Sequence, residues 1–424
     1  MVAITLPVLI GFAALGAETG LWYTIKRQNQ TAADAAAISA AYEVAAYEVI
    51  AGKTIMTSDL APAAHEAATQ NGYTGTTTAV VHPYSDGIVS NGVAVTLRQT
   101  QPGLLASLFL PSVTIATKAV AVIKILDNPC VLALATTGID IQVFTFASLD
   151  VLNCSIAANS TGKSAIDIYD NTGSITAATL VTPGEVSFQG NPIDPTAPPP
   201  EFALTSRPMI GTPSVADPYA GTLTHAFLTS SIPAKPVPRH SWNETRTIYP
   251  DLYDKGMSFG PRAVIDMMPG VYYVTNGNFS VASGATVRCT TCSGAYGVTI
   301  VLTTTQATGT VGNVQISLGA TVTLGAPNSG TFSGLLFIQD PLAMSSGSTT
   351  PPDNALQGGP GMNLNGLLYF PNTTVGFDGN PSAACTLLIT NQLIIKGNSN
   401  FRISGCTSAG LTILPVVNTV ALAE

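Results

Sequence analysis

Cysteine pairs are the most prominent chemical groups in this chain, which carries six cysteines. They fall into local pairs along the sequence, and an even number of cysteines so arranged favours disulfide bonds and an oxidising compartment. The predicted bonds are Cys130–Cys154, Cys289–Cys292 and Cys385–Cys406.

The closest pair, Cys289 and Cys292, forms a CTTC motif that could instead bind zinc or exchange electrons. A zinc site would need a second pair of ligands at a suitable spacing, and no histidine lies near the motif. A redox pair would be expected in a thioredoxin-like pattern, whereas this motif lies among predicted strands. A structural hairpin disulfide is therefore expected, with no metal site and no cofactor.

Catalytic motifs are scarce. No GxSxG, HExxH or P-loop pattern is present, and none of the four histidines lies near a serine or cysteine signature. Asp167 and Asp170 are close in sequence, but on a strand their spacing would place them on opposite faces. Asp251 and Asp254 fall in a predicted loop. Solvated surface acids are the simpler interpretation, and the chain is not expected to be an enzyme. The histidines are His65, His82, His225 and His240.

One charge, Glu18, interrupts the almost uninterrupted apolar sequence of residues 2–25. An ionisable residue inside a membrane segment is functional by default and needs a partner, such as a cation on a neighbouring subunit. Alternatively, Glu18 lies close enough to Trp22 for its carboxylate to reach water at a membrane interface. Both interpretations stay open at this point.

The apolar stretch is long enough to cross a bilayer as a helix, which takes roughly 20 residues. Aromatic residues and then Lys26 and Arg27 follow it, which is the usual arrangement at a membrane–water interface. Three glycines could let neighbouring helices approach closely, although glycine is also common in such helices without any role. The stretch is too long for a cleavable signal, and no basic segment precedes it. The glycines are Gly11, Gly16 and Gly20.

A helix is also predicted for residues 28–50, where Ile38, Tyr42, Ala45 and Val49 recur on one face of a 3.6-residue period. We therefore expect one N-terminal helix over residues 1–52. Strands are predicted at residues 76–81, 92–99 and 113–123, which are rich in β-branched residues. Together they predict a small antiparallel sheet within residues 53–126, which gives a pilin-like α+β unit.

From Cys130 onward the chain is expected to be all-β. Short apolar runs recur between glycine, asparagine, serine and threonine, which predicts the stacked coils of a β-solenoid, or parallel β-helix; a β-sandwich is the alternative. Coils of about 20 residues would bring the spaced cysteines together on adjacent turns. The predicted solenoid has two parts, residues 127–190 and 263–424, the second ending in a C-terminal strand. Residues 191–262 are Pro-rich and predict a loop or linker.

Composition limits the function further. Only 9% of the residues are charged, against roughly 25% in a typical soluble protein. The net charge is −8 and no run of lysine or arginine occurs, so no nucleic-acid partner is expected. The hydrophobic fraction of 46% is that of a folded protein. Low charge with much threonine, serine and glycine is common in exported surface proteins.

Residues 6–41 resemble the N-terminal signature of TadE/TadG-type proteins of the Tad (tight adherence, or Flp) pilus-assembly system. The signature has an early proline, an acidic residue followed by glycine, an aromatic, a basic residue, glutamine and an AADAAA run. Segments 71–75, 108–122, 128–134 and 216–221 also resemble the longer TadG-type members. The chain departs from the family in lacking a basic stretch before the apolar helix and in having Glu18 where aspartate is commoner. The matching residues are Pro7, Glu18, Gly20, Trp22, Tyr23, Lys26, Arg27, Gln30 and residues 32–37.

The resemblance implies a structural, non-enzymatic surface protein, with its bulk in the periplasm or outside the cell. Its implied partners are copies of itself, other pilus-assembly components and the inner membrane, which the N-terminal helix would enter. Whether it is a main filament subunit or a minor component stays open. The alternative from another class is a membrane-anchored β-helix enzyme or lectin that acts on extracellular polysaccharide.

Overall fold

The computed structural model describes residues 2–45, 55–85, 92–103, 107, 111–125, 129–151, 154–305, 309–348, 351–358, 362–378, 386–397, 400–403 and 418–422. In the first helix the side chains are described from residue 16 onward. The chain divides into two compact units, Met1–Leu126 with Val416–Glu424, and Asp127–Pro415.

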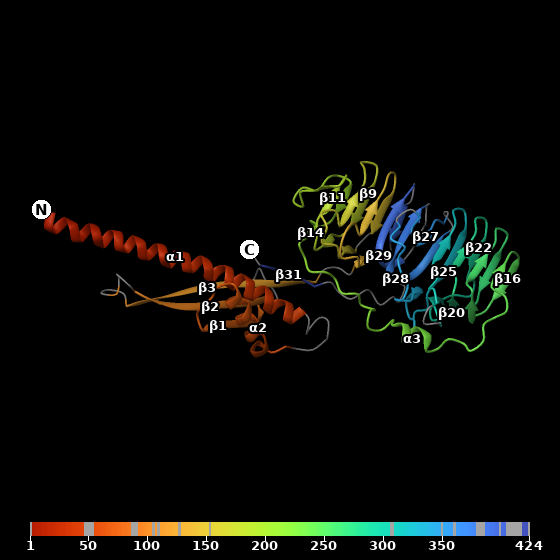
Figure 1. Ribbon diagram of the computed structural model, residues 1–424, viewed down its shortest axis with the longest axis horizontal. Helices are drawn as coiled ribbons and strands as arrows, with labels where there is room; N and C mark the ends of the chain where they lie inside the picture. Colours follow the sequence, from red (N-terminus) through yellow and green to blue (C-terminus); the bar gives the residue numbers. More distant parts are fainter. Residues whose placement is uncertain are drawn as a thin grey trace. The chain divides into compact units, whose positions relative to one another are not determined.

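The first unit is a long helix and a short helix on a small antiparallel sheet (Figure 1). The strand order in the sheet is β1-β2-β3-β31. The last strand of the chain pairs with β3, Val420 lying opposite Ile123, so the C-terminal strand belongs to this unit. The elements are α1 (Val2–Val44), α2 (Thr57–Gln70), β1 (Thr77–Tyr84), β2 (Gly92–Pro102), β3 (Ser112–Ile125) and β31 (Asn418–Leu422).

Alanines make the contact between α1 and the rest of the unit. Ala33, Ala36, Ala37 and Ala40 are fully buried and share a core with strand β2. They recur at helical spacing, and their short side chains let the helix approach the sheet closely. Of the predicted face, Ala45 is buried, Ile38 and Tyr42 are only half-buried, and Val49 lies outside the described residues. The face that packs most closely is the alanine face beside it.

Helix α2 is not among the predicted elements. Its buried residues Leu60, Ala64 and Ala68 recur every four positions, which is the spacing of one helix face. Pro62 lies inside the helix, near its start, where a proline disturbs few hydrogen bonds. The three strands predicted at residues 76–81, 92–99 and 113–123 do form, as β1, β2 and β3.

The second unit is built almost entirely of short strands. The first group runs from residue 129 to residue 210. It comprises β4 (Pro129–Ala133), β5 (Ile141–Val143), β6 (Ser148–Val151), β7 (Ser155–Ala158), β8 (Ile166–Ile168), β9 (Ser174–Ala177), β10 (Leu180–Thr182), β11 (Val186–Phe188), β12 (Asn191–Pro192), β13 (Phe202–Leu204) and β14 (Met209–Ile210).

A second group follows a single short helix, α3 (His225–Thr229). It comprises β15 (Ser241–Trp242), β16 (Thr245–Ile248), β17 (Leu252–Asp254), β18 (Met257–Phe259), β19 (Val264–Met267), β20 (Gly270–Thr275), β21 (Phe279–Val281), β22 (Thr286–Arg288), β23 (Val298–Thr303), β24 (Val314–Ile316), β25 (Thr321–Gly325), β26 (Leu335–Gln339), β27 (Asn354–Leu356), β28 (Asn363–Asp378), β29 (Thr386–Lys396) and β30 (Asn400–Ile403).

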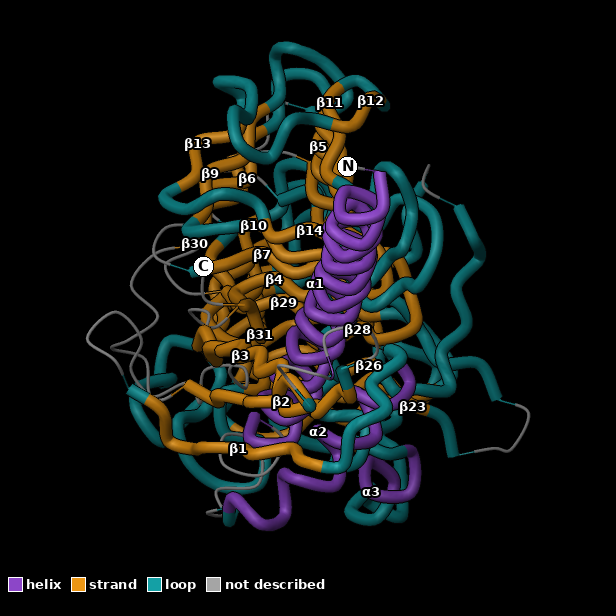
Figure 2. The backbone as a smooth tube through the Cα atoms, turned by 90° about the vertical axis from the view of Figure 1, so that its left-hand side faces the viewer, coloured by secondary structure: helices purple, strands orange, loops and turns teal. Residues whose placement is uncertain are grey.

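Pairing between these strands is almost wholly parallel and forms three sets of ladders. In the second group, a strand pairs with the strand three positions further on, as in β16–β19–β22–β25, β17–β20–β23–β26 and β18–β21–β24–β27. The long strand β28 takes part in all three ladders through its pairing with β25, β26 and β27, and the long strand β29 takes part in two through its pairing with β4 and β5. In Figure 2, β13, β9 and β6 follow one another in the order of their ladder.

The two groups of strands join in the middle of the unit rather than at its ends. Strand β29 pairs with β4 and β5, and Leu388 lies opposite Val131. From β4 the chain therefore builds outward to β14, and it later returns from β15 back to β29 (Figure 1). Segments more than 250 residues apart in the sequence are thus adjacent strands.

Residues 211–240 connect the two groups, and we call this segment the strap. Near its start, Val215 and Asn159 exchange two hydrogen bonds, of 2.8 and 2.7 Å. Further on, the Tyr369 hydroxyl donates to Asp217 Oδ2 at 2.8 Å. The strap is therefore fixed to strands of both groups.

The linker predicted for residues 191–262 is wrong in part. Within it, β13, β14 and β15–β18 pair in the parallel ladders and β12 pairs antiparallel with β11, whereas the strap carries no strand. Prolines fit here because the strands are as short as two to four residues, so most prolines fall in the turns between them.

Two of the predicted disulfides are present. Cys130–Cys154 joins β4 to the turn before β7, with Cα atoms 5.8 Å apart. Strands β4 and β7 are neighbours in one ladder. Cys289–Cys292 closes the turn after β22, with Cα atoms 5.4 Å apart. Cys385 and Cys406 lie outside the described residues.

Aromatic side chains form a continuous column in the interior of the second unit. Trp242, Phe259, Phe279, Phe337 and Phe370 are in contact one after another, with ring centroids 5.3 to 6.5 Å apart. All five are buried. Ring pairs in this geometry contribute about 0.5–1.5 kcal/mol each beyond the apolar area that they bury.

Candidate assembly helix

Helix α1 has two parts that differ in their surroundings. From Ala32 onward its alanine face is buried, whereas most side chains between Gly16 and Gln28 are exposed. The exposed part includes large apolar side chains, Leu21 at 46% and Tyr23 at 64% exposure. An apolar surface of this kind on a helix is a candidate contact surface.

Polar side chains hold the helix to its unit where the exposed part ends. Gln28 donates from Nε2 to the carbonyl oxygen of Gly72 at 3.0 Å. Thr117 of β3 donates to the carbonyl oxygen of Asn29 at 3.1 Å, and both residues are buried. These residues were not predicted as positioning groups, although the run of amides at 28–30 between an apolar and an alanine-rich segment was visible in the sequence.

The predicted assembly residues do not lie in one environment. Glu18 is 4% exposed and is engaged in an interaction within the chain. Gly16 and Gly20 are exposed, and a Cβ atom added to either would meet nothing within 4 Å. Packing inside this chain therefore does not require these glycines. Trp22 is half-buried, and the side-chain surroundings of residue 11 lie outside what the structure describes.

No helix among the described residues is at once long enough and apolar enough to cross a membrane. The side chains of residues 2–15, which make up most of the predicted apolar span, are not among those described.

Acids in the second unit are bound to neighbouring polar groups. Asp167 accepts hydrogen bonds from the Ser187 hydroxyl at 2.5 Å and from the Gly190 amide at 3.1 Å. Asp170 accepts from Thr172 and Thr145, and these hydrogen bonds lower the pKa of its carboxyl below its usual value. Both carboxylates therefore hold turns between strands.

Asp254 is likewise a structural acid, because hydrogen bonds from Asn276 and Thr275 reach its Oδ1 and lower the pKa of the carboxyl. Asp251 accepts from the Leu252 amide at 2.8 Å. Within the described part of the chain, no group of three or more histidine, cysteine, aspartate or glutamate side chains could hold a metal ion.

The histidines are dispersed as well. His65 contacts the Thr78 hydroxyl at 2.9 Å in the first unit, and His82 lies 3.2 Å from the Gly92 carbonyl oxygen. His225 of the strap contacts Asp340 at 2.6 Å. His240 lies at the end of the strap, just before β15. The structure does not bring these four side chains together.

Comparison with known proteins finds a match for helix α1. Residues 1–43 match the family model described as "Putative Flp pilus-assembly TadE/G-like". No curated protein and no solved structure matches the chain. The matched segment covers the exposed part of α1, its polar anchor at residues 28–30 and most of its alanine face. The N-terminal helix of this chain is therefore similar to that of TadE/G-like proteins of the Flp (Tad) pilus-assembly type.

Proposed function

We propose that this protein is a structural component of the cell surface, which is anchored or polymerised through α1 and displays the large strand-rich unit. The observation that carries this proposal is the exposed, partly apolar half of α1 within the family-matched segment. The role is assembly rather than catalysis.

Exposure of this half of the helix to water is unfavourable, because many of its side chains are apolar. Leu21 and Tyr23 are exposed, and the sequence before them, residues 2–15, contains a single polar side chain, Thr5. Burying a large apolar side chain gains roughly 1.5–3 kcal/mol, so several such residues would drive the helix into a partner or a bilayer. The proposed partners are the α1 helices of other copies, other pilus-assembly components and the inner membrane.

The displayed unit is proposed to be a β-solenoid with three faces. Parallel pairing of each strand with the strand three positions further on supports this topology. The two disulfides support an oxidising location, the periplasm or the outside of the cell. Short turns and a low charge would suit a domain that is presented on a filament or from the membrane.

Deleting residues 1–27 tests the proposal. The deletion ends before Gln28 and Asn29, so the hydrogen bonds that hold the packed half of α1 remain. We expect the shortened protein to be a soluble monomer by light scattering, and the full chain to form assemblies visible by electron microscopy. Circular dichroism should show that both retain their strands.

A substitution pair refines the test. The double variant Leu21→Asn/Tyr23→Asn should weaken assembly, because it removes apolar side chains that are exposed in the single chain. Met344→Asn is the matched control, since Met344 is 89% exposed in the other unit. The proposal is wrong if the protein lacking residues 1–27 forms the same assemblies as the full chain.

A further inference from the structure

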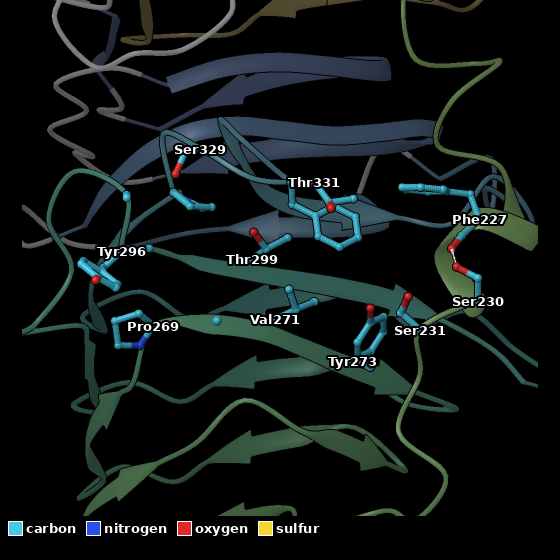
Figure 3. Close-up of a pocket in the computed structure, with 15 residues that line it drawn as sticks. Phe227, Ser230, Ser231, Pro269, Val271, Tyr273, Tyr296, Thr299, Ser329 and Thr331 are labelled. Atoms are coloured by element: carbon cyan, nitrogen blue, oxygen red, sulfur yellow. Dashed lines mark hydrogen bonds between the residues drawn. The ribbon is translucent and has the colours of Figure 1, made fainter.

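A pocket of about 420 Å³ lies in the second unit, between the strap and the strands β20 and β23 (Figure 3). Val271 and Thr299 belong to its floor, and Phe227, Ser230 and Ser231 form the wall that the strap supplies. The volume falls in the range of roughly 300–1,000 Å³ that is typical of small-molecule sites. The proposed assembly role of α1 makes no use of this pocket.

The lining is polar but uncharged. None of the described residues that line the pocket is an acid, a lysine, an arginine or a histidine. The polar groups are hydroxyls, among them those of Ser231, Ser329 and Thr331, which are exposed. A hydroxyl both donates and accepts hydrogen bonds. The pocket therefore offers nothing to neutralise an ionic ligand and suits a neutral ligand that carries hydroxyl groups.

Aromatic rings stand at both ends of the pocket. Figure 3 shows Tyr296 with Pro269 at one end and Phe227 at the other. Tyr296 is 68% exposed and Phe227 is 37% exposed. Because these rings are exposed on a concave surface, a ligand can pack against their flat apolar faces without any other side chain having to move first.

Tyr273 of β20 supplies a further hydroxyl to the lining of the pocket. The residue is 5% exposed, yet no hydrogen bond from any described residue reaches its hydroxyl. Burial raises the pKa of this hydroxyl, so it stays protonated and can donate as well as accept. A ligand hydroxyl can therefore hydrogen-bond to the Tyr273 hydroxyl without displacing a side chain from it.

The strap wall is held in place before any ligand arrives. His225 Nδ1 lies 2.6 Å from Oδ2 of the fully buried Asp340, and Phe227 packs edge-on against Phe332 with ring centroids 5.9 Å apart. The Ser230 hydroxyl donates to the Phe227 carbonyl oxygen at 2.7 Å. A wall that is already ordered lowers the entropic cost of binding.

We propose that this pocket binds a neutral saccharide. A sugar ring has apolar C–H faces that fit against aromatic rings, and its edge carries hydroxyls that match the hydroxyls of the lining. Glycoside hydrolysis generally needs two carboxyl groups beside the bond that is cleaved, and the lining supplies none. The site is therefore one of binding and not of cleavage.

The test uses the full-length protein with cellohexaose, mannohexaose and chitohexaose as neutral probes. Binding is measured by saturation-transfer NMR and by calorimetry. We expect at least one of the three to bind saturably below about 10 mM, and an anionic oligogalacturonide of the same length to bind more weakly. Each probe is also tested with hexaalanine as a competitor, which should not displace it.

Three variants localise the binding. Tyr296→Ala removes an exposed ring at low risk to folding, and it should weaken binding about tenfold or more. Tyr273→Phe removes only the hydroxyl, and it should weaken binding about three- to tenfold. Tyr169→Ala is the matched control, because Tyr169 is 54% exposed and lies outside the pocket; its affinity should equal that of the wild type.

Four results would overturn the proposal. The first is that none of the neutral probes binds. The second is that Tyr296→Ala binds as tightly as the wild type. The third is that the oligogalacturonide binds more tightly than every neutral probe. The fourth is that hexaalanine displaces the neutral probes.

Discussion

At the scale of single residues, Asp140 is an acid whose burial changes its pKa strongly. It is fully buried in the second unit, where its Oδ2 accepts a hydrogen bond from the Ser160 amide at 2.8 Å. Its Oδ1 has no hydrogen-bond partner within the described structure. Burial raises the pKa of this carboxyl from 3.8 to about 7, and the amide hydrogen bond offsets only part of the effect.

This pKa makes the stability of the second unit depend on pH. The folded protein holds the Asp140 proton more tightly than the unfolded chain does. The stabilisation is therefore complete below about pH 4 and is lost as the pH rises through about 7. Since one pKa unit corresponds to about 1.4 kcal/mol, the free energy of unfolding should fall by roughly 4 kcal/mol across this window.

Asp140→Asn should remove this dependence. The amide is neutral and can still accept from Ser160, so we expect thermal unfolding at pH 8 to shift upward and unfolding at pH 4.5 to change little. Asp194→Asn is the control, because Asp194 is exposed and hydrogen bonds from Thr196 lower its pKa, so it stays ionised from pH 5 to 8. Equal pH profiles for wild type and Asp140→Asn would contradict this account.

At the scale of elements, the alanine face of α1 sets how closely the helix packs. Ala36 is fully buried, whereas its neighbour Ala35 is only half-buried. Both positions are helical and both carry the same residue, so they form a matched pair. If the same substitution is made at both positions, a difference in the stability of the two variants reflects side-chain packing and not helix propensity.

Ala36→Leu should destabilise the first unit by about 1–3 kcal/mol, because the added carbons must push α1 away from the sheet. Ala35→Leu should change stability by less than about 0.5 kcal/mol, since half of that position faces solvent. Amide hydrogen exchange in β2 and β3 measures both effects. Similar exchange in the two variants would mean that the alanine face is not the packed face.

At the scale of the whole second unit, the pairing of β29 with β4 and β5 joins the two groups of strands. The strap connects the two groups covalently and hydrogen-bonds to both, but we expect the strand pairing to be what holds them together. The unit should therefore survive a break in the strap.

Placing a protease site at Gly221 tests this. Gly221 is exposed, and nothing lies within 4 Å of a Cβ atom built there, so an insertion has room. After cleavage we expect the two fragments to elute together in size-exclusion chromatography and to separate only in denaturant. Separation under native conditions would show that the strap, rather than the β4–β29 pairing, joins the two groups.

The sequence by itself determined the features that depend on residues close together in the chain. The apolar and then alanine-rich N-terminal segment predicted a helix and its resemblance to TadE/G-like proteins, because helical periodicity and motif spacing are local. Alternating β-branched residues fixed the strands at 92–99 and 113–123. The pairs Cys130–Cys154 and Cys289–Cys292 followed from short separations.

Only the tertiary structure decided which distant segments meet. No local pattern indicates that residues 129–133 pair with residues 388–390, because parallel pairing depends on how the whole chain returns. The burial of Asp140 and the position of Tyr273 in the pocket are equally hidden in the sequence, since both depend on how strands from separate parts of the chain stack on one another. The alanine face, too, was settled by packing: side chains of least volume let the helix lie closest to the sheet, whatever the hydrophobicity of Ile38 and Tyr42 beside them.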